Sequence, residues 1–176
     1  LDSRVPLTPI QRWFFTEHPL SDVPRYSQSL LLEFKGQVDV ERLTRSLGTV
    51  VARHRALATR IHGLGEESAS QELGARLRPP VVAVVDVSGV EGVEAQQRRL
   101  AEQTADVHDF DLQQGPLVKA VAVNRGSAAP GWVLLVVHHL VVDVVSWRVV
   151  VEDLEAAYAS QGQAQAAPVG ATTSDL

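Results

Sequence analysis

Four runs rich in apolar residues, three of them dominated by valine, stand out along the chain and predict buried strands. They cover residues 27–34, 81–87, 117–124 and 132–140. Valine and isoleucine pack well on a pleated surface, and apolar runs of about four to eight residues are typical of strands covered on both faces. Turn-forming residues separate these runs, at Lys35-Gly36, at Pro79-Pro80 and between Asn124 and Gly131. The pattern therefore indicates a substantial sheet.

Other segments repeat their apolar residues with the period of a helix. The clearest begins at Val40, follows Asp39 as a plausible N-cap, and has apolar positions at 43, 47, 50, 51 and 57 on one face. A second helix is predicted over about 90–105, where Ser88 and Glu91 have capping-box spacing. Its core-facing side chains are expected to be Val93, Leu100, Ala101 and Thr104. A third helix is predicted over about 146–160.

With a further helix placed before the first strand, the elements alternate in the order helix, strand, helix, strand, helix, strand, strand, helix. Such alternation is typical of an α/β domain with a mixed sheet. We therefore expect one domain over residues 1–160. From Gln161 to Leu176 the sequence turns to Gln, Ala, Gly, Pro and Thr, which predicts a linker.

Composition narrows the class of protein. The 176 residues include 16 basic and 21 acidic side chains, a net charge of −5, so we expect no nucleic-acid partner. The longest apolar run, Trp132 to Val137, is far shorter than the about 20 residues of a membrane span, so no membrane partner is expected. The lack of cysteine excludes disulfides and favours a cytoplasmic location. The lack of methionine, with Leu1 first, predicts that the chain is part of something longer.

The densest polar cluster in apolar surroundings is His138-His139, at the end of the last predicted strand. Side chains alternate along a strand, so these two histidines should point to opposite faces rather than bind one metal. One can be structural while the other faces a cleft and moves protons near neutral pH. Asp143, just before the last helix, could cap that helix or receive a cation. The competing interpretation is that both histidines are hydrogen-bonded packing residues.

Other polar residues indicate no site. Asp109 and Asp111 are typical of a turn with two solvated carboxylates, although they could bind a divalent cation. Arg53, Arg55 and Arg60 suggest a solvated surface. Three further histidines, at positions 18, 62 and 108, lie near chain breakers and suggest no function. No phosphate-binding loop or zinc motif occurs.

The histidine segment resembles a family signature. Residues 138–143 read HHLVVD, which is similar to the HHxxxDG motif of the condensation-domain superfamily of nonribosomal peptide synthetases. The following VSWR, with Ser146, Trp147 and Arg148, resembles the epimerization domains of that superfamily. Further similar segments occur in the expected order: VPLTPIQRWFF at 5–15, SQSLLL at 27–32, RHRAL at 53–57, and FDL followed by GPL at 110–117. The resemblance covers residues 5 to 160.

The resemblance implies a fold and a mechanism. The fold would be a chloramphenicol-acetyltransferase-like two-layer sandwich, one lobe of a two-lobed domain with a tunnel between the lobes. The partners would be a peptidyl carrier protein, whose phosphopantetheine arm presents the substrate thioester, and the C-terminal lobe; no cofactor would be bound directly. His139 would be one acid/base group in Cα epimerization, and a glutamate of the second lobe the other. His138, Asp143, Ser146 and Trp147 would support His139.

The sequence departs from the family pattern at two positions. Val144 replaces the motif glycine, and a β-branched residue is strained wherever glycine serves a positive φ. Ala58 replaces an arginine that is expected to pair with the motif aspartate, here Asp143; Arg60 could substitute for it. These departures leave an alternative open, a truncated and catalytically degenerate lobe that serves as a docking module. A self-associating single lobe is the least favoured interpretation.

Overall fold

The computed structural model describes residues 4–74, 80, 82–161 and 166–168. In this part of the chain a five-stranded sheet has the order β5-β6-β7-β2-β8. Strands β5 and β6 pair in parallel, and the other neighbours pair antiparallel, so the sheet is mixed as expected. The bounds are Ser27–Phe34 for β2, Val82–Asp86 for β5, Val118–Asn124 for β6 and Trp132–His138 for β7. All four predicted strands are therefore confirmed to within two residues at either end.

Strand β7 lies inside the sheet and fixes where the histidines lie. It pairs with β2 from Glu33 opposite Trp132 to Ser27 opposite His138, and with β6 on its other side. Its residues alternate between the two covered faces of the sheet, and nearly all of them are buried. The strand ends at His138, where its last backbone N–H bonds to the carbonyl of Leu117 at 3.0 Å. His139 thus begins the loop at the rim of the sheet.

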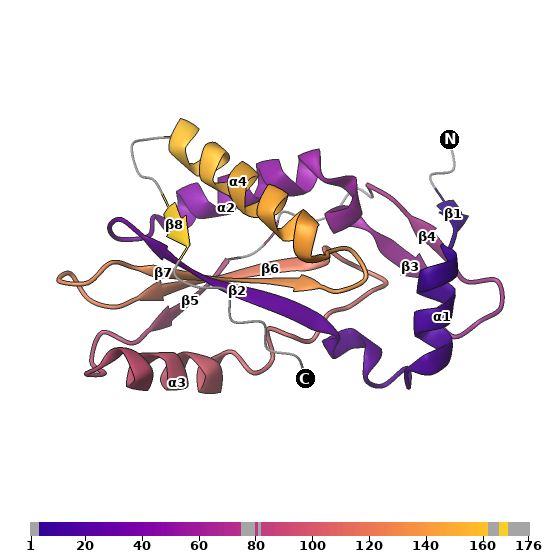
Figure 1. The fold of residues 1–176 in the computed structure, drawn as a ribbon, viewed down its shortest axis with the longest axis horizontal. Coiled ribbons are helices and arrows are strands. Elements are labelled where there is room, and N and C mark those ends of the chain that lie inside the picture. Colours follow the sequence, from indigo (N-terminus) through magenta and orange to yellow (C-terminus); the bar gives the residue numbers. More distant parts are fainter. Residues whose placement is uncertain (1–3, 75–79, 81, 162–165, 169–176) are drawn as a thin grey trace.

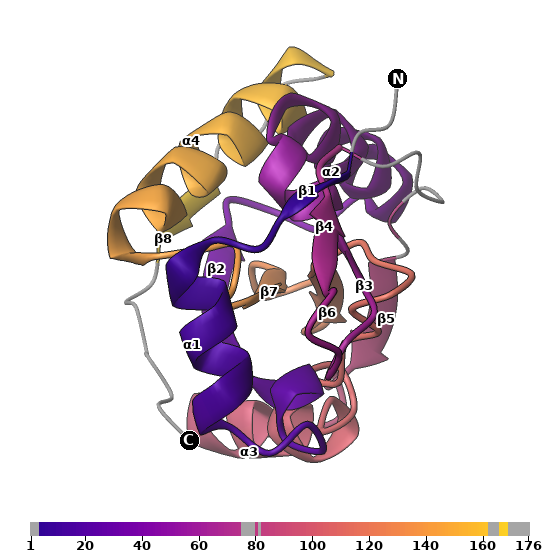
Figure 2. The ribbon, with the colours of Figure 1, turned by 90° about the vertical axis from the view of Figure 1, so that its right-hand side faces the viewer.

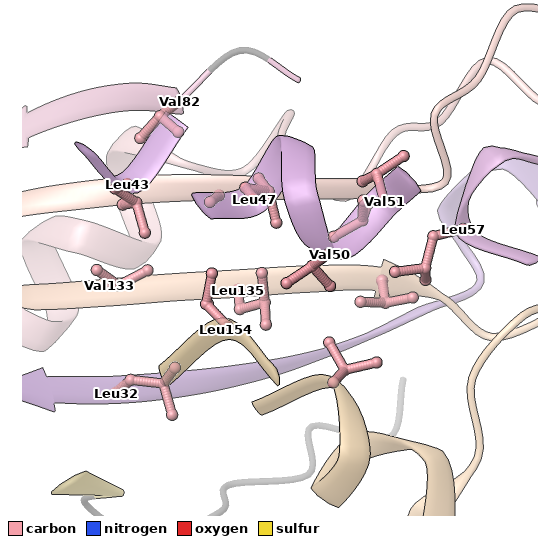
Figure 3. Packing of buried hydrophobic residues seen from close by; sticks show 14 of the residues in the cluster. Leu32, Leu43, Leu47, Val50, Val51, Leu57, Val82, Val133, Leu135 and Leu154 are labelled. Atoms are coloured by element: carbon pink, nitrogen blue, oxygen red, sulfur yellow. The ribbon is translucent and has the colours of Figure 1, made fainter. Parts of the chain in front are cut away.

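Helices α2 (Val40–Arg53) and α4 (Val144–Ser160) cover one face of the sheet (Figure 1). Asp39 is confirmed as the N-cap of α2, because its carboxylate accepts the N–H of Arg42 at 2.9 Å. Figure 3 shows Leu43 and Leu47 of α2 and Leu154 of α4 in one buried cluster with Val133 and Leu135 of β7. This main core holds α4, and with it the loop that carries His139, against the sheet.

Helix α3 (Val93–Gln103) covers part of the opposite face, next to β5 and β6, so that the sheet has helices on both sides (Figure 1). The predicted capping box is wrong. Gly92 is the N-cap with φ +87°, a conformation that favours glycine, and Ser88 instead donates to the carboxylate of Asp86. Leu100 and Thr104 are buried as expected, whereas Val93 and Ala101 are exposed, because the buried face of α3 is the one that carries Gln96 and Leu100.

A second, three-stranded sheet was not predicted. Its order is β1-β4-β3, formed by Arg4–Pro6, Ser70–Glu72 and Arg60–His62. Strands of three residues are too short for an alternating pattern to show in the sequence. The small sheet and helix α1 (Pro9–Glu17) lie together at one end of the large sheet (Figures 1 and 2).

Within the predicted linker, residues Ala166–Pro168 form β8, which pairs antiparallel with the edge of β2. The lack of large apolar side chains in this segment does not prevent it from forming a strand. A strand at the edge of a sheet can be held by backbone hydrogen bonds to its neighbour. The remaining positions of 162–176 lie outside the described residues. Among the described residues, no helix is long and apolar enough to cross a membrane.

Candidate functional site

His138 is fully buried and is held in one neutral form. Its Nε2 lies 2.7 Å from the carbonyl of Val23, and the N–H of Leu140 lies 3.2 Å from its Nδ1. A carbonyl can only accept and an N–H can only donate, so Nε2 carries the proton and Nδ1 does not. Burial lowers the pKa of His138 to about 4. This histidine is therefore neutral at physiological pH, with both nitrogens occupied.

His139 lies in a different environment, half-buried at the wall of a pocket. Its backbone N–H donates to the carbonyl of Tyr26 at 2.8 Å, and its ring stacks on the Tyr26 ring with 5.4 Å between centroids and 11° between planes. Its Nδ1 donates to the carbonyl of Val142 at 3.0 Å, which assigns the proton to Nδ1. Nε2 then keeps its lone pair, and it has no hydrogen-bond partner among the described residues.

The pocket beside His139 has a volume of about 210 Å³ and a largely apolar lining. Helix α1 contributes much of this lining, including Trp13 and Phe14. The helix is fixed by a capping box between Thr8 and Gln11, and the Gln11 amide also donates to Gln71 of the small sheet at 3.0 Å. The unpredicted small sheet therefore helps to place the pocket wall.

His18 and Tyr26 also line the pocket, and sequence reasoning missed both. His18 is the C-cap residue of α1, and its ring packs on Tyr26 with 5.0 Å between centroids. The antiparallel register of β2 and β7, which places Ser27 opposite His138, brings Tyr26 to His139, and the packing of the α1 C-cap on Tyr26 brings His18 there. The one available signal was the unusual density of aromatic residues between Trp13 and Tyr26.

Asp143 caps helix α4, one of the two roles considered for it. One carboxylate oxygen accepts both the N–H and the hydroxyl of Ser146 at 2.7 Å. These hydrogen bonds lower the pKa of the exposed Asp143 carboxyl. Trp147 is buried, and its indole donates to the Gln28 amide oxygen on β2 at 2.8 Å. Asp143, Ser146 and Trp147 thus fix the start of α4, directly after the His139 loop.

The expected strain at Val144 is wrong. Val144 is the first residue of α4, and no described residue other than glycine has a positive φ. A helical φ accepts a β-branched residue at modest cost. The Val144 side chain is 80% exposed.

Ala58 and Arg60 concern the arginine that the family pattern pairs with the motif aspartate. Ala58 is buried in the main core. Arg60 begins β3, and its Nε donates to the carbonyl of Gln114 at 3.1 Å.

The remaining candidate residues have structural partners. The carboxylate of Asp111 accepts the N–H groups of Gln113 and Gln114, as expected for a turn. Two of the histidines form pairs elsewhere: His62 with Glu72 at 3.0 Å and His108 with Ser27 at 2.8 Å. In the part of the chain that the structure describes, no three histidine or carboxylate side chains group as a metal site.

Comparison with known proteins connects this geometry to a family. The family described as the condensation domain matches residues 2–174. A linear gramicidin synthase of Brevibacillus parabrevis is 39% identical over 173 residues, and a surfactin synthase of Bacillus subtilis (strain 168) is 35% identical over 160 residues. The matches cover 98% and 90% of this chain but only 2% and 4% of those proteins.

Solved structures share the fold. The epimerization domain from the third module of tyrocidine synthetase B is 26% identical, with a TM-score of 0.75, over 92% of this chain and 35% of that chain. The SgcC5 protein from Streptomyces globisporus is also 26% identical, with a TM-score of 0.74, over 89% of this chain and 37% of that chain. The starter condensation domain of rhizomide synthetase, at 18% identity and a TM-score of 0.73, supports the fold alone; the match covers 90% of this chain and 39% of that chain. The predicted α/β fold with a mixed sheet is therefore confirmed.

Proposed function

Because the chain belongs to the condensation domain family, we propose that it is the N-terminal half of an epimerization domain of a nonribosomal peptide synthetase. The reaction converts an L-aminoacyl or peptidyl thioester, held on the phosphopantetheine arm of a carrier protein, to its D form. The carrier protein and the C-terminal lobe are the partners in this proposal. The HHLVVD and VSWR segments and the similarity to the tyrocidine synthetase epimerization domain support it.

The observation that carries the proposal is the state of His139. Its Nδ1 is fixed by the carbonyl of Val142 and its ring plane by Tyr26, so the imidazole that carries the free Nε2 is held in one orientation at a residue that lines the pocket. Nε2 takes the Cα proton of the substrate, and the electron pair of the broken C–H bond moves into the thioester carbonyl as an enolate. A second group then returns a proton to Cα from the other face. A positioned general base of this kind contributes about 10²–10⁴-fold to a rate.

A degenerate docking lobe is the second candidate, and Ala58 favours it. A buried alanine stands where the family resemblance places the arginine that pairs with the motif aspartate. Asp143 nevertheless keeps its position through the bonds to Ser146. The two candidates differ in whether the complete domain exchanges the Cα proton.

The test uses the complete domain, comprising this chain and the C-terminal lobe, with an aminoacyl carrier protein in D₂O. Mass spectrometry of the released amino acid should show one deuterium at Cα and a mixture of both enantiomers. His139→Ala should lower the exchange rate at least about 100-fold. The control is His54→Ala, since the His54 ring pairs with Asp153 on α4 and does not line the pocket. Peptide-bond formation without exchange, once a second aminoacyl carrier protein is added as the acceptor, would indicate condensation instead, and neither activity would favour the docking module.

A further inference from the structure

The pocket beside His139 has an aromatic wall that general-base catalysis alone does not require. Its rings form a continuous series, with centroid distances of 6.4 Å from Trp13 to His18, 5.0 Å from His18 to Tyr26 and 5.4 Å from Tyr26 to His139. Phe14 lies behind this series, 4.9 Å from Tyr26. The ring that carries the proposed base is thus one member of an aromatic surface.

The described residues that line this pocket include no lysine, arginine, aspartate or glutamate. The amide among them, Gln11, is already engaged, since its oxygen accepts the N–H of Thr8 and its nitrogen donates to Gln71. A cationic group entering this pocket would lose hydration and find no carboxylate to pair with. The cleft on the other side of α1 is different, because Arg12, Glu66 and Glu67 line it.

Two large apolar side chains at this pocket remain exposed to solvent. Ile10 is 66% exposed and Trp13 is 55% exposed, although residues of these types are commonly buried. A ligand that covers them removes apolar surface from water, which is favourable. The aromatic faces also offer stacking partners for a planar group.

We propose that this pocket binds an uncharged aliphatic or aromatic side chain of the acyl group, next to Nε2 of His139. The inference rests on the proposed function in one respect, that this side chain belongs to the group on which His139 acts. The volume of about 210 Å³ accommodates a single side chain rather than a long peptide. Substrates with basic side chains are excluded by the same lining, which offers no carboxylate.

Trp13 provides the measurement. The chain has three tryptophans, and the other two, Trp132 and Trp147, are buried. Titration of the 176-residue chain with N-acetyl-L-phenylalanine amide should shift the tryptophan emission to shorter wavelength and saturate. N-acetyl-L-lysine amide, with a cationic side chain, should cause no saturable shift. Trp13→Phe should abolish the signal.

The matched variants are Ile10→Asp and Val93→Asp. Both positions hold exposed β-branched residues, at 66% and 52%, but Val93 lies on α3, away from the pocket. Ile10→Asp should weaken binding of the phenylalanine amide at least about tenfold, and Val93→Asp should leave it unchanged. Far-UV circular dichroism confirms that both variants fold.

Three results would overturn the proposal: no saturable binding, equal binding of the two amides, or equal effects of the two aspartate variants. The probes contain no thioester and no exchange is measured. A failure of side-chain binding is therefore distinguishable from a failure of Cα exchange in the complete domain, and either can occur without the other.

Discussion

The two ends of strand β7 differ in how completely their polar groups are satisfied. At the Trp132 end, the indole donates to Glu33 at 3.1 Å, and Arg125 pairs with the same carboxylate at 3.2 Å. The Arg125 guanidinium also lies 3.7 Å above the Trp132 ring and donates to Gln96 at 2.9 Å. We call these residues, Glu33, Gln96, Arg125 and Trp132, the Arg125 cluster. Their polar groups satisfy one another.

At the other end, both ring nitrogens of His138 have hydrogen-bond partners, but only one ring nitrogen of His139 has a partner among the described residues. That nitrogen is Nδ1, which the carbonyl of Val142 holds, and His139 itself lines the pocket. Polar groups near a core are ordinarily satisfied, because leaving one unpaired costs free energy. The contrast shows that the polar groups at the Trp132 end and of His138 stabilise the fold, whereas one ring nitrogen of His139 has no such structural role.

The largest expected effect is the pH dependence of the free energy of unfolding that His138 causes. Its pKa is about 4 in the folded chain and about 6.5 when unfolded, so the unfolded state binds more protons between these values. The stability that neutral His138 contributes is complete above about pH 6.5 and is lost as the pH falls towards 4. The loss amounts to about 3 kcal/mol. Urea unfolding at about pH 7 and about pH 4 measures it.

His138→Gln isolates this contribution, since a glutamine amide can still donate to Val23 and accept from Leu140. The pH dependence of the variant should be weaker by most of that amount. His108, whose pKa is also lowered by burial, changes stability with the same sign and remains in both proteins. An unchanged pH dependence in His138→Gln would contradict the neutral, buried state.

The next effect tests the Arg125 cluster. Glu33→Ala removes the carboxylate that both Arg125 and Trp132 contact, and leaves a guanidinium whose side chain is 8% exposed without its ion-pair partner. Stranding a buried charge is strongly destabilising, but Glu33 itself is about one-third exposed, so we expect a loss of about 2–3 kcal/mol. Chemical denaturation measures this, with the exposed Glu91→Ala as control. If Glu33→Ala and Glu91→Ala were equally stable, the Arg125 cluster would not contribute to the stability of the fold.

A smaller loss is expected where α4 meets the sheet. Trp147→Phe keeps an aromatic ring in the core but removes the hydrogen bond to Gln28. The unpaired amide oxygen and the lost ring volume should cost about 1–2 kcal/mol in unfolding experiments. Pairing this change with Gln28→Ala in a double-mutant cycle identifies the share of the hydrogen bond. Additive effects of the two changes would show that the bond contributes nothing.

How far the sequence predicted the structure depends on whether a feature is local. Strand β2 was predicted with its observed bounds, because its apolar run ends at a turn signal, and Asp39 was identified as a cap from its neighbours. The start of α3 was misplaced, because Gly92 ends the preceding loop through its backbone conformation rather than through a side-chain cap. The small sheet was missed, because three-residue strands form through pairing between distant segments.

The same distinction applies to the candidate site. His138 and His139 were found because they adjoin a strand, and alternation predicted their different environments. Their proton positions could not be predicted, because the carbonyls of Val23 and Val142 determine them. The pocket wall from α1 is likewise a product of tertiary packing, fixed in part by the contact between Gln11 and Gln71. The sequence pattern located the proposed base but not its surroundings.

The smallest expected change in stability belongs to His139, and it completes the comparison between the ends of β7. His139→Gln loses the stacking on Tyr26 and the Nδ1 hydrogen bond to Val142 but leaves the backbone bond to Tyr26 intact, so the free energy of unfolding should fall by about 1 kcal/mol. The residue proposed to carry the chemistry would then matter least to the fold, while its neighbour His138 matters most. A loss for His139→Gln as large as that for Glu33→Ala would mean that the ring holds the loop in place, and its free nitrogen would no longer distinguish the two ends.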